Sequence, residues 1–167
     1  MLIVQLFELL VVSSILIGLI SIVVKGAPYA VTSQKRVNTL VGLLRVKKNE
    51  RAIDLGSGDG RIVIALARAG AIADGYEINP LLVLLSRRKI KQAGLQSQAK
   101  IYWKSFWHAD FSLYTVVTKI GSPHIMRAVG NKLENELQTG ARVGSVTFIF
   151  PGWEKKNEKE RAILYIR

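Results

Sequence analysis

The segment DLGSGDG, residues 54–60, brings three glycines and two acids together at the end of a short apolar run, 51–55, that predicts a buried strand. Glycines at alternate positions let the backbone turn tightly and approach a ligand, because no Cβ atom stands in the way. The G-x-G-x-G spacing differs from that of dinucleotide enzymes and of ATP-binding loops. Asp54 and Asp59 would repel a pyrophosphate, whereas they would attract a zwitterion that carries an ammonium and a sulfonium. The turn therefore predicts a site for such a zwitterion.

A third acid, Glu77, directly follows the second expected strand, 72–76. A carboxylate at the end of a second strand can accept hydrogen bonds from ribose hydroxyls. Glu77 alone would suit an ordinary solvated strand end equally well. Together with Asp54 and the glycine turn, it strengthens the prediction of a cofactor site.

Strands alternate with helices along the rest of the chain, which predicts an α/β fold with a doubly wound parallel sheet. Ligands of such sheets bind at the carboxyl ends of the strands, where both the glycine turn and Glu77 are expected. Strands are expected at 51–55, 72–76, 100–103, 114–120, 141–150 and 162–166. Helices are expected at 37–44, 61–69, 80–93 and 126–137.

Residues 2–24 are almost wholly apolar, with interruptions at Gln5 and Glu8. As a helix they would extend about 35 Å, more than the roughly 30 Å of a hydrocarbon core. No cation precedes Lys25, so a cleaved signal peptide is not favoured, and the cations after it place the rest of the chain on the cytoplasmic side. The sequence therefore predicts a single transmembrane anchor at 1–25, a linker at 26–36 and the site-bearing domain at 37–167, with a buried core helix as the alternative for the first segment.

The chain carries 24 Lys and Arg against 12 Asp and Glu, a net charge of +12. Such an excess favours contact with polyanions, either nucleic acid or the anionic face of a bilayer. The absence of cysteine excludes disulfides, thiolate metal sites and cysteine nucleophiles. His108 and His124 lack companions at metal-ligand spacing, so no metal is expected.

The glycine turn with its flanking acids, joined to the acid of the second strand, resembles motifs I and II of class I S-adenosylmethionine-dependent methyltransferases. More narrowly, the chain resembles the membrane-anchored protein-lysine N-methyltransferases, whose mitochondrial members act on the ATP synthase c-subunit or the adenine nucleotide translocase. The segments that carry this resemblance are DLGSGDGRIVIA (54–65), GYEINP (75–80), LSRRK (85–89), GSPHIM (121–126), KLENELQTGARV (132–143) and FPGW (150–153). The resemblance implies a Rossmann-like fold, S-adenosylmethionine as the cofactor, and a lysine on a membrane or membrane-adjacent protein as the substrate.

The resemblance also implies which residues bind the cofactor. Ser105 and Phe106 follow the third strand, where the family usually has an acid that would meet the adenine amino group. Thr115 stands where an acid usually begins the fourth strand, and one strand, 162–166, stands where the family has a closing pair. The expected fold is therefore a C-terminally short version of the family's. The expected cofactor residues are Asp54, Gly56, Ser57, Gly58, Gly60, Glu77, Ser105 and Phe106.

Methyl transfer from a sulfonium requires in-line alignment and an uncharged lysine rather than a Ser-His-Asp set. Aromatic side chains at Trp107, Phe150 and Trp153 could desolvate that lysine. His124 follows the fourth strand and could accept a proton. The catalytic residue stays unassigned, with His124 and Trp153 as candidates.

Two other functions stay open: a methyltransferase of a small molecule, lipid or quinone at the membrane surface, and a non-catalytic membrane-bound module. A nucleic-acid substrate is not expected, because the N-P-P-[YFW] tetrapeptide of amino-methylating nucleic-acid enzymes is absent. The expected partners are membrane lipid and a protein with a lysine near the membrane. The expected location is a membrane, mitochondrial in a eukaryote, and the oligomeric state is left open.

Overall fold

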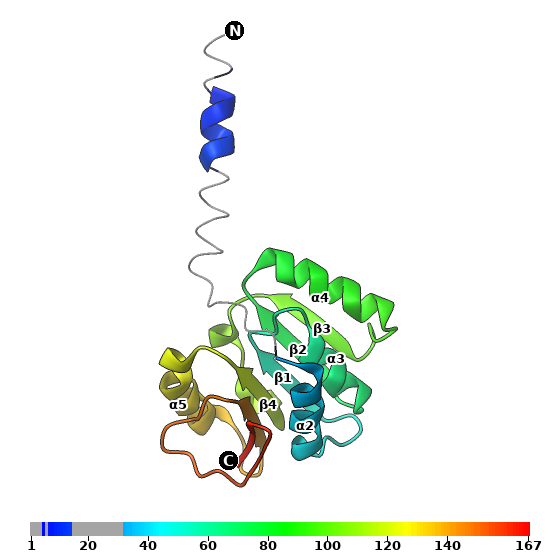
Figure 1. Ribbon diagram of the computed structural model, residues 1–167, viewed down its shortest axis with the longest axis vertical. Coiled ribbons are helices and arrows are strands. Elements are labelled where there is room, and N and C mark those ends of the chain that lie inside the picture. Colours follow the sequence, from blue (N-terminus) through cyan, green and yellow to red (C-terminus); the bar gives the residue numbers. More distant parts are fainter. Residues whose placement is uncertain (1–4, 6, 15–31) are drawn as a thin grey trace.

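A computed structural model of the chain describes residues 5, 7–14 and 32–167. One sheet with helices on both faces makes up its C-terminal part (Figure 1). The helices are α2 (Gln34–Leu44), α3 (Arg61–Arg68), α4 (Pro80–Gln92) and α5 (Met126–Glu136), with short 3₁₀ turns η1 (Phe106–His108), η2 (Phe111–Leu113) and η3 (Pro123–Ile125). The strands are β1 (Arg51–Leu55), β2 (Ile72–Glu77), β3 (Ala99–Trp103), β4 (Val116–Ile120), β5 (Arg142–Val146), β6 (Asn157–Lys159) and β7 (Ala162–Ile166).

The seven strands lie in the order β3-β2-β1-β4-β5-β7-β6. The first five in this order are parallel, which agrees with the predicted doubly wound core. β7 runs antiparallel to both β5 and β6, so the sheet is mixed and the prediction of a wholly parallel sheet is wrong. The physical reason is that no crossover helix follows β5, and β7 instead returns from β6 through a two-residue turn, which permits only antiparallel pairing.

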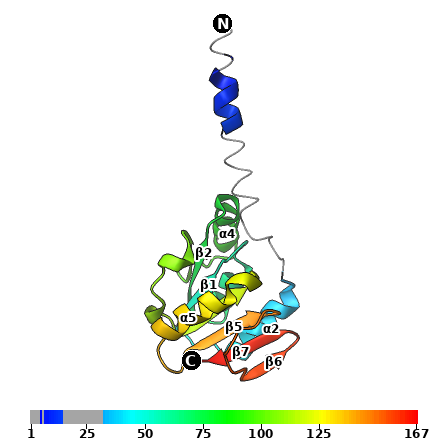
Figure 2. The same cartoon turned by 90° about the vertical axis from the view of Figure 1, so that its left-hand side faces the viewer.

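A hairpin that the sequence analysis missed closes the sheet. β6 pairs with β7 through a two-residue turn, Glu160 and Arg161, in which both residues have positive φ angles of 51° and 66°. Figure 2 shows this hairpin at one end of the sheet beside α2, where Lys35 forms an ion pair of 2.8 Å with Glu160. The chain therefore has a closing strand pair, and the expected C-terminal shortening of the fold is wrong.

The two faces of the sheet bury separate hydrophobic clusters. Neighbouring residues of a strand point to opposite faces, so Ala52 belongs to the cluster beneath α2, α3 and α4, whereas Ile53 belongs to the cluster beneath α5. Val116 and Val117 of β4 divide in the same way. Because β1 and β4 are central and covered on both faces, their carboxyl ends hold the site residues on a fixed frame.

The first segment of the chain differs from the prediction of a transmembrane anchor. Residues 7–14 are helical, but no helix within the described residues is both long and apolar enough to span a bilayer. This finding contradicts the predicted single-pass membrane location, and the predicted contact with membrane lipid has no support in the described ranges. The rest of the proposed anchor, residues 1–4, 6 and 15–25, and residues 26–31 of the proposed linker lie outside them. Residues 34–36 of that linker belong to α2.

Candidate active site

The glycine turn joins β1 to α3 in backbone conformations that favour glycine. Gly56, Gly58 and Gly60 have φ angles of 85°, 55° and 80°, a region that residues with a Cβ rarely adopt. Gly60 also allows close packing, because a Cβ atom there would lie 2.8 Å from the Cβ of Ser86 in α4. The amides of Gly56 and Ser57 each donate to the carbonyl of Tyr76 at 3.0 Å, which fastens the turn to β2.

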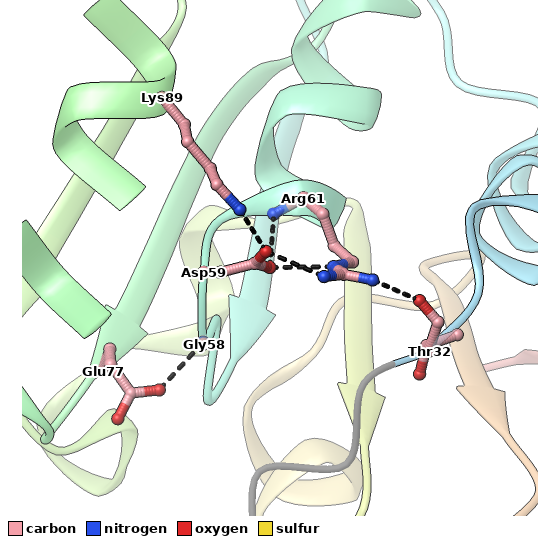
Figure 3. Close-up of polar contacts among 6 residues, drawn as sticks. All are labelled: Thr32, Gly58, Asp59, Arg61, Glu77 and Lys89. Atoms are coloured by element: carbon pink, nitrogen blue, oxygen red, sulfur yellow. Dashed lines mark hydrogen bonds and ion pairs between the residues drawn. The ribbon is translucent and has the colours of Figure 1, made fainter. Parts of the chain in front are cut away.

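Glu77 at the end of β2 is oriented by three backbone amides. Its Oε2 accepts a hydrogen bond of 2.9 Å from Gly58, and its Oε1 accepts bonds of 2.8 Å from both Ile78 and Asn79. Figure 3 shows the contact that links this carboxylate to the turn. A carboxylate has about four acceptor positions, so about one is left for a further donor. The structure thus brings Glu77 and Gly58 together, although they are far apart in sequence.

Asp54 is buried beside the turn, with one oxygen satisfied and the other not. Thr118 on β4 donates a hydrogen bond of 2.6 Å to its Oδ1. Its Oδ2 has no hydrogen-bond partner among the described residues, and the same holds for the buried Oγ of Ser57. Burial raises the pKa of Asp54 to about 7, against the opposing effects of the Thr118 hydrogen bond and the nearby charge of Lys119. Two unsatisfied buried oxygens next to a glycine turn are a fitting surface for a polar ligand.

Asp59, the second acid of the turn, is already paired with cations of the chain itself. Arg61 binds it through two nitrogens at 2.8 Å, and Lys89 of α4 binds its Oδ2 (Figure 3). Arg61 also donates to the carbonyl of Thr32 at 2.6 Å. The charge of Asp59 is therefore compensated within the protein, so of the two acids predicted to attract a cationic ligand, only Asp54 has an unpartnered oxygen among the described residues.

The structure adds Lys119 to the site, a residue that the sequence analysis did not single out. Lys119 is 3% exposed at the carboxyl end of β4, and its Nζ lies 5.9 Å from the ring centroid of Phe106 in η1. A Cβ atom on Gly56 would lie 4.0 Å from this Nζ. Phe106 therefore lies near the carboxyl end of β4, beside Lys119. Ser105 caps η1, because its Oγ accepts a hydrogen bond of 3.4 Å from the amide of Trp107. A lysine near the end of a mostly apolar strand was the signal available in the sequence.

The candidate catalytic residues lie in different surroundings. His124 is exposed in η3, directly after β4. Trp153 packs against Phe150 and Tyr165, with ring centroids 5.5 Å and 6.0 Å away, so it takes part in the cluster beneath α5. Phe150 is 1% exposed and belongs to the same cluster, whereas Trp107 is 40% exposed. Catalytic roles for His124 and Trp153 stay predictions.

A cavity of about 690 Å³ lies between α2, α3 and α4. Asp59, Arg61, Arg68 and Lys89 line it together with apolar residues such as Ile64. None of the eight expected cofactor residues contributes to its lining. The glycine turn therefore touches this cavity only through Asp59, and the cavity is separate from the set formed by Asp54, Glu77 and Lys119.

Comparisons with known proteins match this chain to methyltransferases. A family model described as the ANTKMT methyltransferase domain matches residues 54–157. The ATP synthase c-subunit lysine N-methyltransferase of Mus musculus is 43% identical over 126 residues, which cover 75% of this chain and 51% of that protein. A protein-lysine N-methyltransferase of Saccharolobus islandicus is 34% identical over 135 residues, covering 80% of this chain and 84% of that protein.

A solved structure gives a further match. The RNA methyltransferase of Salinibacter ruber, in complex with S-adenosyl-L-homocysteine, superposes with a TM-score of 0.76 and 32% identity over 82% of this chain and 92% of that one. The mixed seven-stranded sheet is consistent with the class I methyltransferase fold. The chain spans about half the length of the ATP synthase c-subunit methyltransferases it matches. On the matched family model and the extent of the Saccharolobus alignment, this chain belongs to the ANTKMT methyltransferase family.

Proposed function

We propose that this chain is an S-adenosylmethionine-dependent protein-lysine N-methyltransferase whose catalytic domain begins with α2 at Gln34. The observation that carries the cofactor part is the buried Oδ2 of Asp54, which lacks a partner among the described residues at the edge of a glycine turn. The substrate part is supported by relatives named for lysine methylation of the ATP synthase c-subunit and of the adenine nucleotide translocase. The target is then a lysine of a protein.

The residues present fit this cofactor. The Oδ2 of Asp54 is suited to an ammonium group, since a buried acceptor without a donor is costly and a charged donor would satisfy it. Glu77 has room for about one ribose hydroxyl beside its three amide bonds. Gly56 and Gly58 leave the backbone open to close approach, and Ser105 and Phe106 are assigned to the adenine.

The chemistry asked of the protein is mainly alignment. When bound, the cofactor supplies a methyl group on a positively charged sulfur. The chain must hold a lysine amine in line with it, exclude water, and keep that amine uncharged, because only the neutral amine has a free electron pair.

Calorimetric titration with S-adenosylmethionine and S-adenosylhomocysteine tests the cofactor part. We expect the full chain to bind both ligands and Gly58→Val to bind neither. Valine disfavours the φ angle of 55° at this position, and its side chain would occupy space beside the glycine turn. Glu77→Ala should lose about 1.5–3 kcal/mol of binding free energy. Unchanged affinity in both variants would refute the assignment.

An RNA methyltransferase is the second candidate, and two observations favour it. The Salinibacter enzyme is named for RNA, and the chain carries a net charge of +12, which suits a polyanion. Transfer of radiolabelled methyl groups from the cofactor to a cell extract, fractionated into protein, RNA and lipid, separates these functions. Label in acid-stable methyl-lysine supports the leading proposal, label in RNA supports the second, and label in lipid or small molecules supports the alternative expected from the sequence.

A further inference from the structure

Lys119 is a buried cation that the proposed mechanism does not yet use. It is the partner of Leu55 in the register between β4 and β1, and its residue is 3% exposed. Lysines are rarely buried to this extent unless they are paired, since removal of the ammonium from water is costly. A buried lysine at the carboxyl end of a central strand lies where doubly wound sheets bind their ligands.

The hydrogen bonds of Lys119 go to backbone carbonyls instead of a carboxylate. Its Nζ donates to the carbonyl of Ile120 at 2.9 Å and to that of Gly121 at 3.3 Å. A carbonyl oxygen carries no full charge, so these bonds compensate the ammonium less than an ion pair would. In the part of the chain that the structure describes, no salt bridge within 4.0 Å involves Lys119.

The charged groups that act on Lys119 come from β1, which neighbours β4, and from β2, the next strand beyond β1. Asp54 of β1 and Glu77 of β2 both favour its charged form, but burial outweighs them and lowers the pKa of Lys119 to about 8. The ring of Phe106 covers it from η1 at 5.9 Å, and His124 of η3 is exposed. A lysine in such surroundings can exchange a proton near neutral pH.

The same ammonium lies close to the glycine turn. A Cβ built on Gly56 would meet the Nζ of Lys119 at 4.0 Å, and Lys119 Nζ is its nearest neighbour. A sulfonium cofactor held by Asp54 and the turn would bring a second positive charge close to this buried ammonium. Two like charges at short range in a medium of low dielectric constant repel strongly, so one of them must be removed.

We propose that Lys119 releases its proton when the sulfonium cofactor binds and that its neutral amine then accepts the proton of the target lysine. The inference rests on the proposed methyltransferase function and gives that reaction its proton acceptor. The proton balance is closed: the target ammonium gives one proton to the Nζ of Lys119 and becomes a free amine. That amine attacks the methyl carbon, and the carbon–sulfur bond breaks toward sulfur. Lys119 keeps the transferred proton until the next sulfonium cofactor binds, so each turnover releases one proton to solvent.

The first test compares proton release on binding of two ligands that differ in charge at sulfur. Calorimetry in buffers of different ionisation enthalpy gives the number of protons released by the full chain with S-adenosylmethionine and with uncharged S-adenosylhomocysteine. The same titrations are made on Lys119→Met and on Lys104→Met, a control that removes an exposed lysine one residue before Ser105. The amino group of the ligand titrates alike in all three proteins. The difference in the number of protons released by wild type and by Lys119→Met therefore gives the protons that Lys119 releases.

At about pH 7 the wild type should release close to one more proton with S-adenosylmethionine than Lys119→Met does, and this difference should vanish above about pH 9. Lys119→Met should bind S-adenosylmethionine about tenfold more tightly than wild type at the lower pH, with little change for S-adenosylhomocysteine. Lys104→Met should behave as wild type. Equal proton release by wild type and Lys119→Met would overturn the proposal, whereas failure of wild type to bind either ligand would instead refute the proposed function.

A second variant separates proton transfer from a structural role. Lys119→Gln retains a donor for the carbonyls of Ile120 and Gly121 but cannot accept a proton in this pH range. If Lys119 is the proton acceptor, the rate of methyl transfer by this variant should be at least about tenfold lower than that of wild type at neutral pH. The rate should recover as the pH approaches the pKa of a free lysine amine, because the target lysine then loses its proton to solvent. A Lys119→Gln enzyme with the rate and pH profile of wild type would contradict the proposal, and this variant also serves if Lys119→Met does not fold.

Discussion

The hydroxyl of Thr118 and the carboxylate of Asp54 lie 2.6 Å apart, buried between two adjacent central strands. The two residues are register partners of β4 and β1, so the sheet itself sets their separation. The hydroxyl occupies one oxygen of the carboxylate and leaves the other for a ligand. Thr118, which the sequence motif did not include, therefore orients Asp54, the first acid of the motif.

Replacement of Thr118 by valine keeps the shape of the side chain and removes this donor. Asp54 would then lose its one described hydrogen bond, and the free energy of unfolding should fall by about 1–3 kcal/mol. Urea denaturation measures the loss. Thr115→Val is the matched control, because Thr115 is exposed beside the same strand and should change stability by less than about 0.5 kcal/mol. A loss of equal size in both variants would argue against a special role for the buried hydroxyl.

The raised pKa of Asp54 makes a prediction about stability and pH. The folded carboxyl titrates near 7 and the unfolded one near about 3.9, so between these values only the unfolded state loses its proton. The contribution of this group to stability is therefore fully present below about pH 4 and is lost as the pH rises to 7. Across this window the free energy of unfolding should fall by up to about 4 kcal/mol. Asp54→Asn removes the titration. The stability of this variant relative to wild type should rise across that window and stay level above it, and a flat difference throughout would contradict the shift.

Asp59 should matter for the fold more than for the ligand. Its side chain is 4% exposed and binds both Arg61 and Lys89, so Asp59→Asn would leave two cations beside a neutral amide. We expect unfolding to become easier by about 1–3 kcal/mol, while affinity for S-adenosylhomocysteine changes by less than about threefold. Asp54→Asn should show a larger loss of affinity than Asp59→Asn. The opposite ranking of the two variants would mean that the compensated acid, and not Asp54, receives the ligand.

Much of the fold could be predicted because local signals agreed with burial. Short segments with apolar residues set β1 and β2 before their polar ends. Pro80 lies in the first turn of α4, and Asn79 caps that helix by accepting from the amide of Leu81 at 3.0 Å. β5 ends at Val146, earlier than predicted, because Thr147 has a φ angle of 71° and leaves the strand. β6 was missed because its three residues are exposed and polar and the turn after it contains no glycine.

The site was predictable where it depends on consecutive residues and not where it depends on pairing between strands. The glycine turn and Glu77 are visible in the sequence as a motif. The contact of Asp54 with Thr118 and the approach of Lys119 to Gly56 require the order β1-β4, which brings residues more than 60 positions apart together. The neutralisation of Asp59 similarly requires the packing of α4 beside the turn.

The closing hairpin offers a stabilising substitution. Arg161 has a φ angle of 66°, and a residue with a Cβ pays about 1–2 kcal/mol in this left-handed region, more than the entropy that glycine adds. Arg161→Gly should therefore raise the free energy of unfolding by about 0.5–1 kcal/mol in thermal denaturation. Lys159→Gly, two residues earlier in β6, should lower it, because there glycine only weakens a strand. Destabilisation by both substitutions would show that the side chain of Arg161 contributes more than its backbone strain costs.

Transfer of a methyl group to protein lysine is the central claim, and mass spectrometry of a methylated target tests it most directly. The full chain and S-adenosylmethionine would be incubated in three separate reactions. The first would contain the purified ATP synthase c-subunit, the second the adenine nucleotide translocase, and the third a total protein extract. The Gly58→Val variant would serve as the inactive control in each reaction. The predicted result is methyl-lysine at one defined position of a protein with wild type and none with the variant. Full binding of the cofactor without methyl-lysine on any protein, together with methylated RNA or a methylated small molecule, would contradict the account.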